Sequence, residues 1–179
     1  ISFSLFFPVL AQKSRSEYLS YTSYIQSERE DRITRIDSVV LQINERMGEH
    51  DSEIGIVYSK GDKVDIGYAW IEDMNGNIIR KLKKNEITDR SYISDITLYQ
   101  DDFIKTFHLK HNIYPYKVVY SIKFTSKYPQ IIDVDDTQRQ IPLRNRKIIV
   151  ETPADKKIKY KQCNIDLPQI DSVGNKIVY

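Results

Sequence analysis

Residues 96–124 read ITLYQDDFIKTFHLKHNIYPYKVVYSIKF, and this stretch decides the fold. From Tyr116 to Phe124, large apolar side chains alternate with mostly polar ones, which is the period-two pattern of a strand that buries one face. At about 3.3 Å per residue, such a strand extends roughly 30 Å. A weaker alternation from Phe103 to Leu109 predicts a second strand, joined to the first through Tyr114-Pro115-Tyr116.

The same alternation recurs on both sides of this stretch. Upstream, three segments place apolar residues on one predicted face: Val39, Leu41 and Ile43; Ile54, Ile56 and Tyr58; and Val64, Ile66, Tyr68 and Trp70. Downstream, strands are predicted over residues 131–134, 146–151 and 157–161. Many strands, frequent turns and few short helices predict an all-β fold, specifically an antiparallel β-sandwich.

One hairpin turn is predicted within this series. Residues 74–77 contain the pair Asn75-Gly76, which type I′ turns prefer because both central residues need a positive φ. We therefore expect residues 78–83 to return antiparallel to the strand that contains Trp70.

Composition describes an ordinary folded domain with flanking segments. The chain has 179 residues, of which 40% are hydrophobic and 29% are charged, so it can bury a core and is not of the disordered class. Its 27 basic and 25 acidic residues nearly balance, which gives no electrostatic argument for nucleic acid or a membrane surface. The single cysteine, Cys163, excludes an internal disulfide.

Both ends of the chain differ from the strand-rich middle. Residues 1–11 read ISFSLFFPVLA, an apolar run followed by the short side chains that a signal peptidase inspects. We predict a signal-peptide remnant there; a buried first strand or helix is the alternative. About ten residues cannot span a hydrocarbon core of roughly 30 Å, so no stable membrane insertion is expected after signal removal. The protein is therefore predicted to be exported to the periplasm or cell envelope.

The remaining boundaries follow from changes of pattern. Residues 12–35 are predicted to be an N-terminal linker, in which a short helix over 15–26 fits the capping-box spacing of Ser14 and Glu17. Residues 36–165 form the predicted β-sandwich domain. Residues 166–179 are predicted to start a linker to a C-terminal region.

Two groups of residues are candidate metal ligands. His108 and His111 are three residues apart, and on a strand such residues face opposite sides, so they do not suit one metal ion. Asp133, Asp135 and Asp136 resemble the start of a calcium loop. Positions six and twelve of an EF-hand loop would be Gln138 and Arg144 instead of Gly and Glu, so the EF-hand motif fails. A solvated acidic turn is favoured, and a calcium site of another type stays open.

No pattern in the chain indicates catalysis. Cys163 has a lysine nearby, but a cysteine hydrolase also needs a positioned histidine, and a structural cysteine is favoured. Motifs for a serine hydrolase, a zinc protease, a P-loop and a dinucleotide site are absent from the sequence. Trp70 and the tyrosines could form a sugar-stacking platform, although tyrosine at period two is typical of a core. We therefore assign no catalytic, cofactor-binding or metal-binding residues and no cofactor.

Five segments together resemble the domain of unknown function that precedes transglutaminase-like domains in exported bacterial proteins. They are Asp37-Ser38-Val39-Val40-Leu41, Asn75-Gly76-Asn77, Leu98-Tyr99-Gln100-Asp101-Asp102, Pro115-Tyr116-Lys117-Val118-Val119-Tyr120-Ser121 and residues 148–153. The chain departs from the family pattern with Asn75 for Asp, Gln100 for Ser and Val119 for Glu. The resemblance covers about residues 36–179.

The resemblance implies a β-sandwich module of a secreted or envelope protein. Transglutaminase-like domains carry their triad in the order Cys, His, Asp, whereas Cys163 follows every histidine of this chain. Any catalytic domain is therefore expected C-terminal to Tyr179. The expected function is a non-catalytic module that packs against, or positions substrate for, that domain. The alternative is a stand-alone glycan- or peptide-binding sandwich, and a hydrolase in its own right is least favoured.

Overall fold

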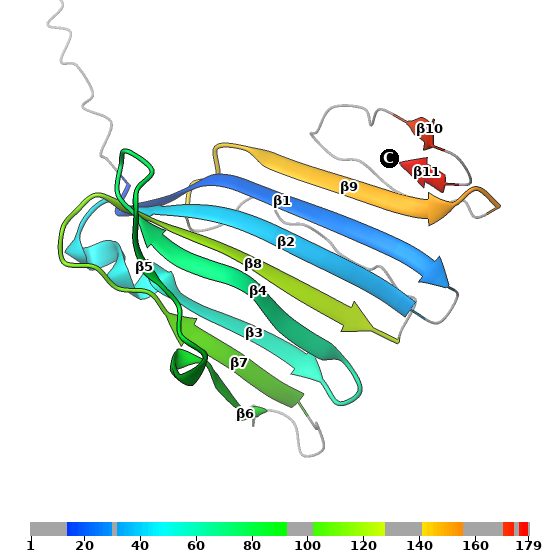
Figure 1. Ribbon diagram of the computed structural model, residues 1–179, viewed down its shortest axis with the longest axis horizontal. Helices are drawn as coiled ribbons and strands as arrows, with labels where there is room; N and C mark the ends of the chain where they lie inside the picture. Colours follow the sequence, from blue (N-terminus) through cyan, green and yellow to red (C-terminus); the bar gives the residue numbers. More distant parts are fainter. Residues whose placement is uncertain are drawn as a thin grey trace, which may run out of the picture.

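Two β-sheets pack face to face in the computed structural model, which describes residues 14–29, 32–92, 102–127, 141–155, 170–173 and 176–178 (Figure 1). The large sheet has the order β10-β11-β9-β1-β2-β8-β4-β5, with β1 (Ser16–Arg29), β2 (Arg32–Ile43), β4 (Lys63–Glu72), β5 (Ile78–Lys81), β8 (Tyr116–Ser126), β9 (Arg146–Pro153), β10 (Asp171–Val173) and β11 (Lys176–Val178). The small sheet has the order β3-β7-β6, with β3 (Glu53–Ser59), β6 (Thr88–Tyr92) and β7 (Asp102–His108). Two short 3-10 helices, η1 (Arg46–Ser52) and η2 (Lys84–Glu86), complete the described elements.

The predicted all-β sandwich is confirmed, with one exception to its antiparallel order. Strands β1 and β9 pair in parallel, and every other strand pair among the described residues is antiparallel. A parallel pair needs a crossover connection, and β9 indeed follows β1 only after seven other strands in the chain. Strand β8, predicted from residues 116–124, lies inside the large sheet between β2 and β4.

The short helix predicted over residues 15–26 is wrong, because these residues form β1. Strand β1 pairs with β2 along most of its length, and this pairing overrides the local capping signal. The register of β1 against β2 is irregular between Tyr18 and Ser20. This irregularity lets Tyr18 and Tyr21, three residues apart, face the same side, as the partners Leu41 and Val39 do.

The predicted C-terminal linker also needs correction. Residues 171–173 and 176–178 form β10 and β11, and β11 pairs with β9 at the end of the large sheet. Other predictions lie outside the described residues: the signal-peptide remnant over 1–11, the strands over 131–134 and 157–161, the acidic turn of Asp133, Asp135 and Asp136, and Cys163. In the described part of the chain, no helix has the length and apolar character needed to cross a membrane.

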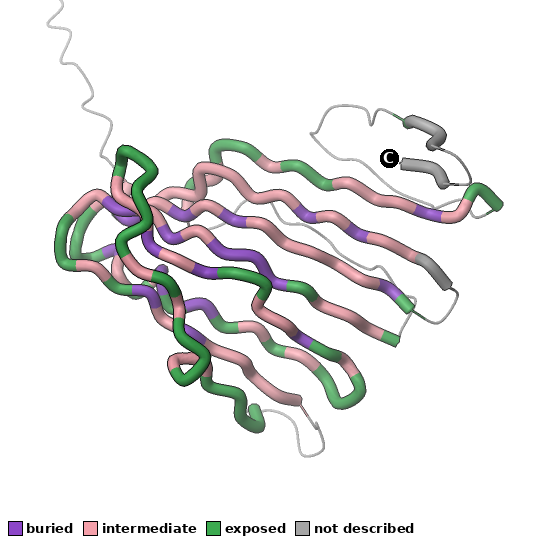
Figure 2. The backbone as a smooth tube through the Cα atoms, in the orientation of Figure 1, coloured by how far each residue is buried: buried purple, intermediate pink, exposed green. Residues whose placement is uncertain are grey.

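The core fills the space between the sheets. Its fully buried side chains come mainly from the inner faces of β2, β8 and β4, where Figure 2 shows the buried positions concentrated. From the small sheet, Phe107 packs edge-on against Tyr120 of β8, with ring centroids 5.9 Å apart. These two rings connect the sheets at the centre of the molecule.

A β-bulge in β4 changes which of its residues are buried. Ile66 pairs with Ile122 and Tyr68 pairs with Ser121, so Gly67 is an extra residue on β4. The bulge exchanges the two faces of the strand beyond it, and Ala69 and Ile71 are buried instead of Tyr68 and Trp70. The prediction that Tyr68 and Trp70 share a face with Val64 and Ile66 is therefore wrong.

The hairpin between β4 and β5 is confirmed, but its turn is one residue out of the predicted position. The Gly76 N–H donates to the Asp73 carbonyl (3.2 Å), which makes Met74 and Asn75 the central residues. Gly76 follows with φ +89°, a conformation that glycine adopts without strain. The Asp73 carboxylate accepts from the side-chain amide of Asn77 and from the backbone N–H groups of Asn77 and Asn75, all at 2.8 Å, and these bonds lower the pKa of Asp73. The aspartate at the first turn position thus accepts hydrogen bonds from the residues that follow it in the turn.

Candidate functional site

A hollow of about 630 Å³ opens between the inner face of the large sheet and the edge of the small sheet. Strands β1, β2 and β8 supply one wall, and residues 53–57 of β3 supply the other. Ile122 and Phe124 give the hollow an apolar part of its lining, whereas Arg35 and Asp37 bring charges to it. The small sheet thus covers part of the large sheet and leaves a polar region of its inner face along the hollow.

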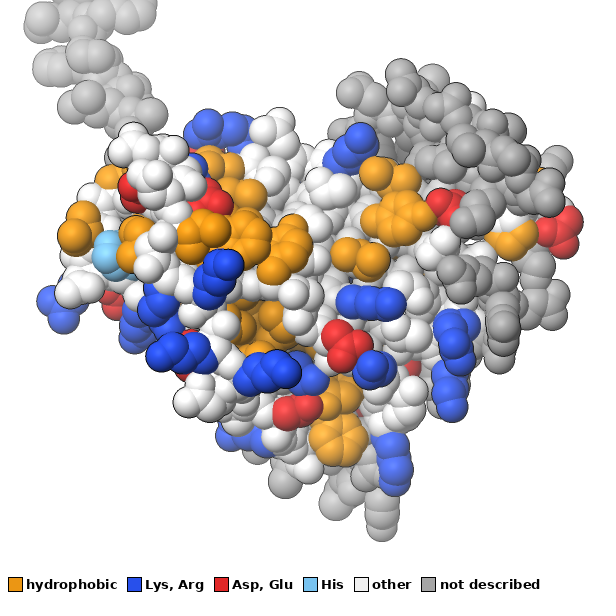
Figure 3. Space-filling view, in the orientation of Figure 1, with side chains coloured by type: hydrophobic (Ala, Val, Ile, Leu, Met, Phe, Trp, Pro, Cys, Tyr) orange, Lys and Arg blue, Asp and Glu red, His pale blue; other side chains and the backbone are white. Residues whose placement is uncertain are grey.

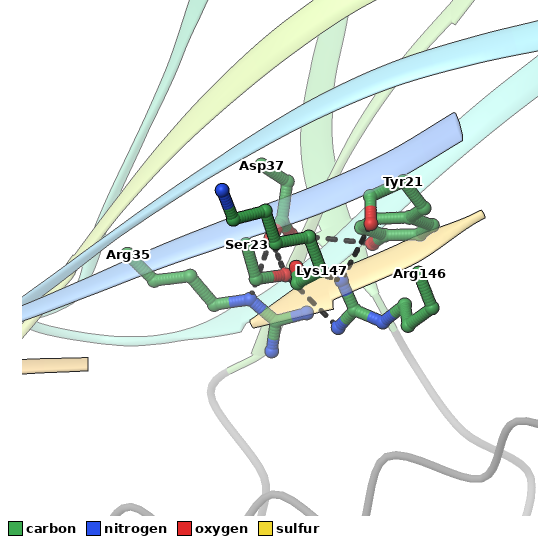
Figure 4. A network of polar contacts seen from close by, with 6 residues as sticks. All are labelled: Tyr21, Ser23, Arg35, Asp37, Arg146 and Lys147. Carbon is green, nitrogen blue, oxygen red and sulfur yellow. Dashed lines mark hydrogen bonds and ion pairs between the residues drawn. The ribbon is translucent and has the colours of Figure 1, made fainter. Parts of the chain in front are cut away.

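Asp37 is the centre of this polar region (Figure 4). It lies on β2, opposite Ser23 of β1, and its side chain is only 14% exposed. Its Oδ1 accepts hydrogen bonds from Ser23 Oγ and from Arg35 Nε (2.9 Å), and its Oδ2 accepts from the Tyr21 hydroxyl (3.2 Å). Three donors and a positive charge therefore compensate the loss of water around this carboxylate.

Arg146 extends the network to β9. Its guanidinium lies 4.5 Å from the centre of the Tyr21 ring, and its Nη2 donates to Ser23 Oγ at 3.1 Å. Its Nη1 donates to the carbonyls of Tyr21 (3.0 Å) and Lys147 (3.1 Å). One arginine thus bonds to both strands of the parallel pair, which makes it a positioning residue for β9.

The network is a mutually satisfied set of donors and acceptors. Ser23 donates to Asp37 and accepts from Arg146, so its hydroxyl proton is directed at a carboxylate. A serine nucleophile is usually activated by a histidine, whereas the groups bonded to the Ser23 hydroxyl are the Asp37 carboxylate and the Arg146 guanidinium. These contacts hold β1, β2 and β9 in place, which is a structural role.

A second polar cluster joins η1 to the connection before β8. The Glu49 carboxylate accepts from the Tyr114 hydroxyl, and burial followed by this hydrogen bond raises the pKa of Tyr114 to about 12. The Glu49 carbonyl accepts from Ser52 Oγ at 2.6 Å and lies 3.2 Å from His108 Nε2. This cluster fixes η1 against the small sheet.

The two histidines considered as metal ligands point to different neighbours. His108 contacts the Glu49 carbonyl, whereas the His111 ring packs edge-on against Tyr116, with centroids 5.8 Å apart. Across the described ranges of the chain, no three His, Cys, Asp or Glu side chains gather in a way that could hold a metal ion.

The outer face of the large sheet carries the aromatic pair Tyr68 and Trp70. Their ring centroids are 4.7 Å apart, and Tyr68 is 41% exposed. The Trp70 indole donates to Glu72 at 2.7 Å, and Glu72 pairs with Lys117 at 3.7 Å. Figure 3 shows hydrophobic side chains grouped on the face in view, with lysine and arginine side chains around them.

Sequence reasoning did not identify the Asp37 network. In the sequence, Asp37 belongs to a segment of the family pattern, and Arg146 is only the first residue of a predicted strand. A usable signal existed, because Asp37 is two residues from Val39 and therefore occupies an inward position of a predicted strand. The parallel pairing of β1 with β9 could not be read from the sequence, so the contacts of Arg146 with Tyr21 and Ser23 could not be predicted.

Comparison with known proteins identifies a family and a fold. The model of a domain of unknown function with solved structure, DUF3857, matches residues 30–177. No curated protein matches the chain. A solved structure from Parabacteroides distasonis, described as a candidate protease, is similar with a TM-score of 0.73 and 14% sequence identity over 92% of this chain. An M1 zinc metallopeptidase from Deinococcus radiodurans matches with a TM-score of 0.42 and 11% identity over 96% of this chain.

These structural matches cover only part of the other proteins. The chain spans 34% of the Parabacteroides protein and 40% of the Deinococcus protein. The first match shows the same fold as one part of a longer chain.

Proposed function

The chain belongs to the DUF3857 family, and we propose that it is a non-catalytic module of an exported protein that packs against, or positions substrate for, a C-terminal transglutaminase-like or peptidase-like domain. One observation carries the proposal. The same fold, with a TM-score of 0.73, forms about a third of a longer protein described as a candidate protease. A module of this kind contributes geometry, and the chemistry lies elsewhere in the protein.

The interior polar network supports a scaffolding role. The network consists of hydrogen bonds that Ser23, Tyr21 and Arg146 make to Asp37 or to each other. Such a network rigidifies the sheet and fixes strand order, because each partner depends on the others. The resemblance also implies a triad order that Cys163 does not match.

The first test compares this chain with its full-length parent protein. Both are assayed for amide hydrolysis and acyl transfer, and turnover is expected only from the parent. The reading frame after Tyr179 should encode a domain with Cys, His and Asp in that order. Turnover by the chain alone, abolished by Cys163→Ala, would contradict the proposal.

Export is tested separately. N-terminal sequencing of the protein recovered from outside the cytoplasm should give a sequence that starts near Gln12. Recovery of a mature protein that retains residues 3–7 would contradict the predicted signal peptide.

A second candidate function rests on the outer-face aromatic pair. Tyr68 and Trp70 present adjacent rings, and exposed aromatic rings can stack on sugars. A glycan-binding sandwich would lose binding with Tyr68→Ala or Trp70→Ala and keep it with Tyr92→Ala, which removes another exposed tyrosine. Glycan-array binding that is unchanged in all three variants would exclude this function for the aromatic pair.

A further inference from the structure

Strand β3 forms one edge of the small sheet, and half of its backbone groups point away from its partner. The Leu109 N–H donates to the carbonyl of Ser52, which lies opposite it in register (3.4 Å). In an antiparallel ladder the bonded positions alternate, so Ile54 and Ile56 bond to β7. The N–H and C=O groups of Gly55 and Val57 therefore point to the free edge. No strand in the described part of the chain pairs with this edge.

This edge lacks the features that usually block pairing. Strand β3 reads EIGIVYS; it keeps a regular register with β7 over seven residues and carries one charge, at Glu53. By contrast, the opposite edge strand β6 carries Asp89 and Arg90, and the short edge strand β5 of the large sheet carries Arg80 and Lys81. Charged residues and short strands protect edges against pairing, so β3 is open to pairing by comparison.

The surroundings of β3 select the kind of partner. Gly55 and Val57 are exposed, and residues 53–57 line the hollow whose other wall is the inner face of the large sheet. An incoming strand would continue the small sheet over the inner face of the large sheet, and this confined space suits a single extended segment better than the edge of a second folded sheet. Inward side chains of this segment would meet Ile122 and Phe124, whereas its outward side chains would lie beside the exposed Glu53 carboxylate.

We propose that β3 binds an extended polypeptide that adds as a further strand to the small sheet, with alternating apolar and basic side chains. Backbone hydrogen bonds to Gly55 and Val57 would supply affinity, and the alternating side chains would supply specificity. The proposal deepens the substrate-positioning part of the proposed function and rests on it. In that role, β3 holds a peptide substrate in the extended conformation that peptidases and acyl-transfer enzymes act on.

The test uses the 179-residue chain and a capped nine-residue peptide of alternating lysine and valine. Hydrogen exchange of single amides is measured by NMR with and without the peptide. Exchange at Gly55 and Val57 should slow, whereas exchange at Ile54 and Ile56, already bonded to β7, should stay unchanged. A peptide with N-methyl groups along one edge should bind at least about tenfold more weakly, because its backbone on that edge has no N–H groups to donate to β3.

Variants of Val57 test the same point from the protein side. Val57→Pro removes an N–H that faces the free edge, a place where proline is tolerated in strands, and should lose peptide binding. Val57→Thr keeps the N–H and should bind normally. If circular dichroism shows that Val57→Pro does not fold, the binding of the N-methylated peptide to the unmodified chain decides whether the proposal holds.

Three results would overturn the proposal. They are equal binding of the N-methylated peptide, no binding of the unmodified peptide at millimolar concentration, and protection of Gly55 and Val57 that depends on protein concentration without peptide, which would indicate pairing between two copies. The proposed function fails on a different result, turnover by the chain alone, so the two failures can be told apart.

Discussion

Ser23 and Asp37 lie directly opposite each other on β1 and β2, and the serine hydroxyl donates a hydrogen bond to Asp37 Oδ1. Arg35 donates to the same oxygen from the same strand as Asp37, and Tyr21 donates to the other oxygen. A carboxylate on the inner face of a sheet costs free energy unless hydrogen bonds and an opposite charge compensate. These donors therefore allow β2 to carry a negative charge beside an apolar core.

Replacement of Asp37 should be costly. Asp37→Ala removes the acceptor shared by Ser23 and Arg35 in a largely buried place, and we expect the free energy of unfolding to fall by about 2–4 kcal/mol. The control is Asp65→Ala, which breaks a solvent-exposed pair with Lys63 (3.1 Å) and should cost about 1 kcal/mol or less. Urea unfolding followed by circular dichroism measures both. Equal losses in the two variants would show that the network around Asp37 does not stabilise the fold.

Gly48 should not tolerate a side chain. A Cβ atom there would lie 2.4 Å from the carbonyl oxygen of Arg15, which already accepts a hydrogen bond from the Asn44 N–H. Backbone cannot move aside as a flexible side chain can, so Gly48→Ala should lower the free energy of unfolding by about 1–3 kcal/mol. Gly55→Ala is the matched control, because its Cβ would meet only side-chain atoms at 3.5 Å or more, and a change within about 0.5 kcal/mol is expected. A stable Gly48→Ala variant would mean that η1 can shift away from β1.

Tyr58 and Asp89 should make stability depend on pH in the alkaline range. The hydrogen bond from the Tyr58 hydroxyl to Asp89 (2.6 Å), aided by burial, raises the pKa of Tyr58 to about 12. In the unfolded chain tyrosine ionises near pH 10. Between about pH 10 and 12 the unfolded chain therefore binds fewer protons than the folded one, and the free energy of unfolding falls as pH rises. Below about pH 10 the contribution of this pair is fully present.

The measurement is a titration of tyrosine absorbance, with Tyr58→Phe subtracted to isolate one residue. Asp89→Asn should return the pKa of Tyr58 toward its ordinary value, because the charged acceptor is lost. On the acid side, the pKa of Asp89 is lowered by the same hydrogen bond, so its contribution is present above the ordinary aspartate pKa and is lost as pH falls through the lowered value. A Tyr58 that titrates near pH 10 in the unmodified chain would refute the pairing.

Period-two alternation was sufficient to predict the central strands but not the ends of the sheet. Tyr116, Val118 and Tyr120 are buried as their spacing predicts, because a regular strand cannot present them elsewhere. Irregular pairing defeated the same reasoning in two strands. The register shift after Tyr18 interrupts the alternation in β1, and the extra Gly67 exchanges the faces of β4.

The candidate site was less predictable than the fold for a different physical reason. Its members come from β1, β2 and β9, and residues 21 and 146 meet only through a parallel pairing. The hydrophobic pattern of a single strand states which side is buried but does not state which strand lies next to it. The inward charge of Asp37 was visible in the sequence, whereas its partners required the sheet order.

The bulge at Gly67 predicts opposite results for Tyr68 and Ile71, which both follow it on β4. Ile71 is fully buried beyond the bulge, so Ile71→Ala should lower the free energy of unfolding by about 2–5 kcal/mol through lost burial and a cavity. Tyr68 lies on the outer face, and Tyr68→Ala should cost about 1 kcal/mol or less, mainly from the lost contact with Trp70. Without the bulge the order would be reversed, because Tyr68 would face the core with Val64. Urea denaturation of the two variants, with Val64→Ala as a third, therefore tests for the bulge in solution. Val64→Ala should lose about as much stability as Ile71→Ala.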